Sequence, residues 1–101
     1  MSRTRLDLQA KFEEICDNVY FQKPRDNKMI YPCILYNLSR IRLMHANNKV
    51  YNHKRRYTVT YITKNPDDPI IDSMLYLFEQ IHWDRQYESN NLYHNVYELY
   101  F

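Results

Sequence analysis

Glycine is absent from this sequence of 101 residues, although average usage would supply about seven. Phosphate-cradling loops, dinucleotide-binding loops and the nucleophile turn of α/β-hydrolases all depend on glycine, so these three classes of site are excluded. Tight turns need another residue at positive φ. We expect asparagine there, because ten are present, including the pairs Asn47-Asn48 and Asn90-Asn91.

Cysteine and long apolar runs are also scarce. Cys16 and Cys33 have no metal-site or redox spacing, and we predict two buried thiols, with a disulfide as the minor alternative. No apolar run approaches the ~20 residues that span a bilayer. The first eight residues are too charged for a secretory signal. The sequence thus predicts a soluble protein in a reducing compartment, with no membrane partner.

Charge of either sign is nearly balanced, with 14 basic and 12 acidic residues and a net charge of +2. Hydrophobic residues make up 45% of the chain, which is typical of a globular protein. The mean hydropathy of −0.76 is low because tyrosine, which occurs 11 times, scores as polar but packs as a large apolar group. We predict one folded domain over residues 1–101.

Periodicity predicts two helices and a sheet. Apolar residues at helical spacing predict helices over 5–18 and 69–81, the second with Asp68 as N-cap and Pro69 at its first position. Four segments have strand character: 29–36, 41–46, 54–63 and 92–101. Residues 82–87 are ambiguous and extended by default. The candidate core residues are Leu8, Phe12, Ile15, Val59, Met74, Leu77, Phe78 and Ile81.

This element order predicts an α+β fold with two layers. An antiparallel sheet of about four strands is packed with two helices on one face. Pro32, within the segment 29–36, favours an edge position or a bulge there, because proline cannot donate a ladder hydrogen bond.

Side chains that carry chemistry form no recognisable motif. None of His45, His53, His82 and His94 has a zinc-like spacing to another ligand. The acidic pair Asp67-Asp68 is better explained by the start of a helix. We therefore expect no enzymatic activity, no catalytic residue, no metal and no cofactor.

The C-terminal strand is apolar on both faces. Tyr93, Tyr97, Leu99 and Phe101 alternate with Leu92, Val96 and Tyr100. Such a strand must be covered on both faces, and two helices cover one. A second copy of the chain could cover the other; alternatively, the tyrosine hydroxyls reach water at the rim of the sheet.

Four segments together resemble small tail-completion proteins of long-tailed bacteriophages. Residues 31–36 (YPCILY) resemble their YPxIxY opening, and residues 45–51 (HANNKVY) resemble an AdNKxY turn. Residues 57–62 and 65–70 (YTVTYI, NPDDPI) resemble YTVTxI…PDSPI, and residues 83–101 resemble fDRxY…dNLNHdvfxLYF. The departures are the missing serine before Pro69 and Tyr93 in place of asparagine.

The resemblance implies a structural virion protein, a tail terminator that closes into a hexameric ring. Such a ring caps the tail tube in the neck, docks to the head–tail connector or stopper protein, and lets DNA pass through its lumen without specific binding. Assembly would take place in the cytoplasm of the bacterial host.

Two sets of residues follow as candidates. The lumen or docking surface is predicted to contain the basic residues Arg40, Arg42, Lys54, Arg55 and Arg56. The subunit interface is predicted to contain Tyr31, Tyr36, Tyr97, Leu99 and Phe101. Two alternatives remain open: a head-side connector or stopper component, and a small nucleic-acid-binding regulator, for which a basic patch among tyrosines is one signature.

Overall fold

The computed structural model describes residues 5–24, 28–46 and 49–101, and gives the backbone alone for those of residues 42–54 that it includes. Two helices and five strands follow one another along the chain: α1 (Arg5–Glu13), β1 (Val19–Phe21), β2 (Cys33–Ala46), β3 (Lys49–Thr63), α2 (Pro69–Leu77), β4 (Ile81–Ser89) and β5 (Leu92–Tyr100). The α+β class predicted from periodicity is confirmed.

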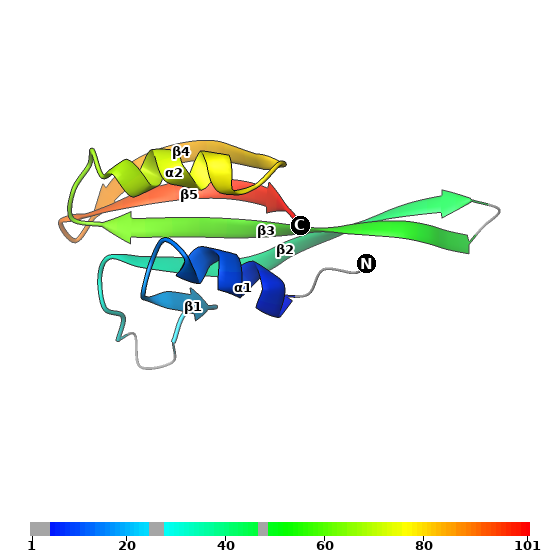
Figure 1. Cartoon of the computed structure of the whole chain (residues 1–101), viewed down its shortest axis with the longest axis horizontal. Coiled ribbons are helices and arrows are strands. Elements are labelled where there is room, and N and C mark those ends of the chain that lie inside the picture. Colours follow the sequence, from blue (N-terminus) through cyan, green and yellow to red (C-terminus); the bar gives the residue numbers. More distant parts are fainter. Residues whose placement is uncertain (1–4, 25–27, 47–48) are drawn as a thin grey trace.

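The sheet has the strand order β1-β2-β3-β5-β4 and is mixed (Figure 1). β1 runs parallel to β2, whereas the other neighbouring pairs are antiparallel. The prediction of about four antiparallel strands is therefore corrected to five strands with one parallel pair. β1 has three residues, which is too short to show a periodic pattern, and it adds to the outer side of β2 at Ile34, Leu35 and Tyr36.

β2 is longer and more central than predicted. It joins the segments 29–36 and 41–46 into one strand of 14 residues that begins after Pro32. A register shift between Leu38 and Arg40 lets the strand continue through Ser39. β2 lies between β1 and β3, so the edge position predicted from Pro32 is wrong, whereas the alternative, a bulge, occurs in this strand at Ser39 and not at Pro32. β1 and β4 are the edge strands.

Both helices pack on one face of the sheet (Figure 1). Leu8 and Phe12 from α1 and Met74 from α2 are fully buried against side chains of the sheet. The central strands contribute alternate residues to this core, as period-two patterning requires: Ile34, Tyr36, Tyr57, Val59, Tyr61, Tyr97 and Leu99. Ile15, Phe78 and Ile81 pack half-buried at its margin, and Leu77 is also half-buried.

The start of α2 is as predicted. Asp68 is the N-cap, and its Oδ1 accepts a hydrogen bond of 3.0 Å from the Ile70 amide. Its Oδ2 accepts bonds from the hydroxyls of Tyr61, at 2.8 Å, and Thr63, at 2.9 Å. The helix ends at Leu77, four residues earlier than predicted, because Phe78 has an extended backbone.

The turn between β4 and β5 uses asparagine where glycine is missing. Asn90 and Asn91 have φ values of 54° and 62°, and they join the paired residues Ser89 and Leu92. Two central residues at positive φ match the twist of an antiparallel hairpin. This confirms the prediction for Asn90-Asn91; the pair Asn47-Asn48 lies outside the described residues.

Substituting Asn91 tests this role. Asn91→Val should lower the free energy of unfolding by about 1–2 kcal/mol, because a β-branched residue is strained at positive φ. Asn91→Gly is the matched control and should leave stability within a few tenths of a kcal/mol. Urea unfolding curves measure both, and equal stability of the two variants would contradict the assignment.

Candidate functional surfaces

A two-stranded arm extends from one end of the sheet (Figure 1). β3 pairs with β2 along both parts of the sheet, but its pairing with β5 reaches only from Thr63 to Arg56. The described part of β3 before Arg56 is therefore paired with β2 alone. We call residues 40–56 the hairpin arm. It contributes to the elongated shape of the molecule, whose longest dimension is 51 Å.

The hairpin register brings the five predicted basic residues to neighbouring positions on two strands, with Arg55 on the other face from Arg56. Arg40 is opposite Arg56, Ile41 is opposite Arg55, and Arg42 is opposite Lys54. Like charges directly opposite one another repel, so the pairs Arg40–Arg56 and Arg42–Lys54 lower the stability of the isolated two-stranded arm. A surface that concentrates positive charge at this cost is a candidate binding surface.

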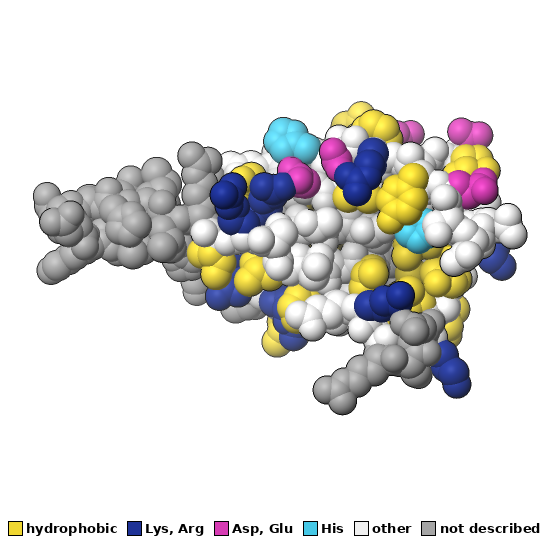
Figure 2. Space-filling model, turned by 180° about the vertical axis from the view of Figure 1, so that it is seen from behind, with side chains coloured by type: hydrophobic (Ala, Val, Ile, Leu, Met, Phe, Trp, Pro, Cys, Tyr) yellow, Lys and Arg dark blue, Asp and Glu magenta, His cyan; other side chains and the backbone are white. Residues whose placement is uncertain are grey.

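The positive charge is local rather than spread over the chain. The hairpin arm has six basic residues and no acidic residue, whereas residues 64–101 have two basic and seven acidic residues. The net charge of +2 conceals this separation. Basic side chains also gather at the end of the sheet next to the arm, on the face opposite the helices (Figure 2).

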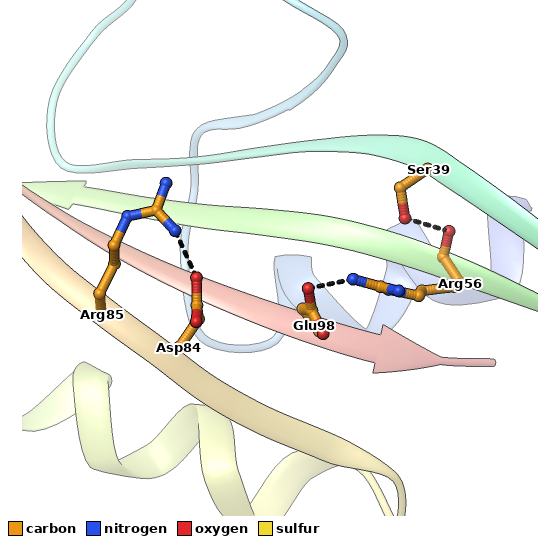
Figure 3. Close-up of polar contacts among 5 residues, drawn as sticks. All are labelled: Ser39, Arg56, Asp84, Arg85 and Glu98. Atoms are coloured by element: carbon orange, nitrogen blue, oxygen red, sulfur yellow. Dashed lines mark hydrogen bonds and ion pairs between the residues drawn. The ribbon is translucent and has the colours of Figure 1, made fainter.

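Two ion pairs lie on this helix-free face (Figure 3). Arg56 binds Glu98 of β5, and Arg85 binds its neighbour Asp84. The Ser39 hydroxyl donates to the Arg56 carbonyl at 2.9 Å. The pair with Glu98 fixes Arg56 at the base of the arm, whereas Arg40 and Arg55 are exposed.

A groove lies between α2 and the edge strand β4. Its volume is about 320 Å³, and it is lined by Pro66, Ile71, Asp72, Leu75, Trp83, Gln86 and Asn95. Trp83 is 49% exposed and Leu75 is 37% exposed. Sequence reasoning missed this surface because it left residues 82–87 ambiguous, extended by default, and gave no sign that Trp83 lies next to α2.

The floor of the groove is polar and ordered. Asn95 is fully buried; it accepts a hydrogen bond of 3.0 Å from Gln86 and donates one of 3.5 Å to the Tyr61 carbonyl. Gln86 also donates to the Pro66 carbonyl at 3.2 Å. These bonds join β3, β4, β5 and the loop before α2 beneath the exposed apolar side chains.

The predicted subunit interface needs correction. Tyr36, Tyr97 and Leu99 are fully buried on the face covered by the helices, so they offer no surface to another subunit. Tyr31 and Phe101 are half-buried, and the Phe101 ring packs edge-to-face on Phe78 at 6.0 Å. The prediction failed because the helices of the same chain cover the face of β5 that was assigned to a subunit interface.

The two cysteines are buried and free, as predicted for structural thiols. Burial raises the pKa of both thiols, and that of Cys33 reaches about 12. A thiol with a raised pKa is a poor nucleophile near neutral pH.

Two of the four histidines have described side chains. The His94 ring stacks on Tyr87 at 4.8 Å, and His82 is exposed on β4. His45 and His53 lie in the arm, where the backbone alone is described. Within residues 5–24, 28–46 and 49–101, no three His, Cys, Asp or Glu side chains come close enough to hold a metal ion.

Comparisons with protein-family models and with curated proteins find no match to this chain. In the described part of the chain, neither helix has the length and apolar character needed to cross a bilayer.

Proposed function

We propose that this chain is a structural subunit of a bacteriophage neck, a tail terminator that forms a hexameric ring between the tail tube and the head connector. The observation that carries the proposal is the basic hairpin arm, which extends beyond the rest of the sheet. Its residues Arg40, Arg42, Lys54, Arg55 and Arg56 are the candidate docking or lumen residues.

Three of the four segments that resemble tail-completion proteins lie in the sheet or at the start of α2, and the fourth, residues 45–51, lies in the arm. Residues 31–36 lead into β2, residues 57–62 are the centre of β3, and residues 65–70 contain the N-cap of α2. The last segment includes the turn at Asn90-Asn91 and all of β5. A likeness concentrated in such positions supports a shared architecture, which in turn supports the shared role.

Binding to separated phage parts tests this proposal. The purified chain should co-sediment with isolated tails that lack a terminator, and tails bound by it should then join to filled heads, as counted by electron microscopy. Binding to heads and not to tails would instead identify a head-side connector or stopper component. Binding to neither would contradict both roles.

The local charge of the arm also favours the nucleic-acid-binding regulator as a second candidate. It predicts that a monomer or dimer binds duplex DNA with an affinity that falls steeply as salt rises. Fluorescence anisotropy with labelled DNA at several salt concentrations measures this. DNA binding by the free chain, without tail binding, would replace the neck proposal with this one.

A further inference from the structure

Two regions of opposite charge occupy different parts of this molecule. The basic region is the hairpin arm, at one end of the sheet. The acidic region is formed by residues 64–101, which include α2, β4 and β5 and contain seven of the 12 acidic residues of the chain. The arm points away from α2 and β4, so it cannot reach the groove between them within one chain (Figure 1).

The α2–β4 groove has one acidic residue in its lining and two more next to lining residues, above the polar floor formed by Gln86 and Asn95. Asp72 lines the groove, Asp67 follows the lining residue Pro66, and Glu88 is two residues after the lining residue Gln86 on the same strand. Residues two apart in a strand share a face, which places Glu88 on the groove side of β4. All three acidic side chains are exposed.

The groove also offers apolar surface that a partner can cover. Trp83 and Leu75 are partly exposed in it, and Tyr76, the next residue on α2, is 89% exposed. β4 is an edge strand, and every residue after Ile81 in it is exposed. Edge strands with exposed aromatic side chains are favourable sites for pairing with another chain.

The arm also has exposed apolar side chains at its base, on the face that Ile41 shares with Arg55. Leu38 and Ile41, at its base, are 36% and 45% exposed. Within the described residues, β1 covers the outer side of β2 as far as Tyr36, and no strand continues that pairing along the arm. Because an isolated two-stranded hairpin is marginally stable in water, the arm gains stability from a partner that covers it.

We propose that the hairpin arm of one copy docks in the α2–β4 groove of a second copy. The contact joins two unlike surfaces, so it repeats from copy to copy and closes into a ring when the rotation permits. Closure into a ring rests on the proposed function, whereas the contact between two copies can be tested independently of that function. A second copy fits better than nucleic acid, because the groove brings both acidic and apolar groups to the arm.

Charge reversal on each side, with a mixing experiment, tests this contact. The arm variant reverses the charge of three residues: Arg40→Glu, Arg42→Glu and Lys54→Glu. Arg42 and Lys54 are opposite each other in the register, and Arg40 is opposite Arg56. The groove variant reverses the charge of its three acidic residues: Asp67→Lys, Asp72→Lys and Glu88→Lys. Arg56 is left unchanged because it binds Glu98 within the chain.

Light scattering behind a sizing column gives the mass of each sample, at about 0.1 M salt and at about 1 M salt. We expect the wild-type chain to exceed the single-chain mass of 12.6 kDa at the lower salt, and each variant alone to have the single-chain mass. An equal mixture of the two variants should regain the higher mass, since each reversed surface then meets an opposite charge. A control variant carries three charge reversals at exposed acidic residues at the end of α1 and just after it, Glu13→Lys, Glu14→Lys and Asp17→Lys, and should keep the wild-type mass.

The outcomes separate this contact from the neck function. A single-chain mass for the wild type at the lower salt, or a mixture that fails to associate although circular dichroism shows both variants folded, overturns the proposed contact. Binding of duplex DNA by the wild-type monomer, lost in the arm variant, overturns it in favour of nucleic acid. Self-association with no binding to tails or heads leaves the contact established and rejects the neck function.

Discussion

Replacing Tyr36 with alanine should lower the free energy of unfolding by about 3–5 kcal/mol, the largest single effect that we expect in this chain. Tyr36 is fully buried on β2, and its ring lies 5.2 Å from that of Phe12 and 5.1 Å from that of Phe21. Its hydroxyl donates to Gln9 of α1 at 2.9 Å. The substitution thus removes the ring and the polar link that together hold α1 on the sheet.

Two further variants separate these contributions. Tyr36→Phe keeps the ring and removes the hydroxyl, so it should cost about 1 kcal/mol. Tyr76→Ala is the surface control, since Tyr76 is 89% exposed, and it should change stability by less than about 0.5 kcal/mol. Urea unfolding curves give all three values. A loss for Tyr36→Phe as large as that for Tyr36→Ala would contradict a mainly packing role.

Replacing Asp68 with alanine should cost about 2–3 kcal/mol, because it removes the N-cap of α2 and leaves two hydroxyls without their acceptor. The affected donors are the Ile70 amide, Tyr61 and Thr63. Asp68→Asn keeps an oxygen for the amide and should lose less. Asp67→Asn is the matched control, because Asp67 is the exposed neighbour.

The contribution of Asp68 should depend on pH. Burial disfavours its charge, but the three hydrogen bonds that it accepts outweigh burial and hold its pKa below the usual value of 3.8. A folded-state pKa below the unfolded one stabilises the fold above the unfolded pKa, and this stabilisation is lost as pH falls through the folded value. The stability difference between wild type and Asp68→Asn should therefore shrink between about pH 5 and about pH 2. A difference that stays constant over this range would contradict the charged role.

Local chemistry predicted the parts of the fold that depend on a few neighbouring residues. Asp68-Pro69 indicated the start of α2, Asn90-Asn91 indicated a turn, and the alternation at Tyr57, Val59 and Tyr61 indicated the core strand. β1 was missed as a strand of the sheet, because a parallel partner joined through a long connection leaves no local signal. The parallel pair depends on contacts between distant segments, which periodicity does not report.

In the candidate site too, the sequence predicted residue types but not the contacts between distant segments. The basic residues were recognised by type, but their meeting across the arm depends on the register that places Arg40 opposite Arg56. Tyr97 and Leu99 were assigned to an interface because both faces of β5 are apolar. Which face the helices cover is decided by tertiary packing, and that face contains Tyr97 and Leu99. The groove required both the strand at Trp83 and its position next to α2, and neither was evident from the pattern.

Ser39 has a consequence for how this protein can vary in length. It is the extra residue at the bulge in β2, between the core part of the strand and the arm, and its hydroxyl binds the Arg56 carbonyl. Because side chains alternate between faces, gaining or losing one residue there would invert the arm relative to the core, whereas a change of two residues would preserve it. Homologues should therefore keep the spacing from Tyr36 to Arg40 constant, even where the arm differs in length beyond Arg40.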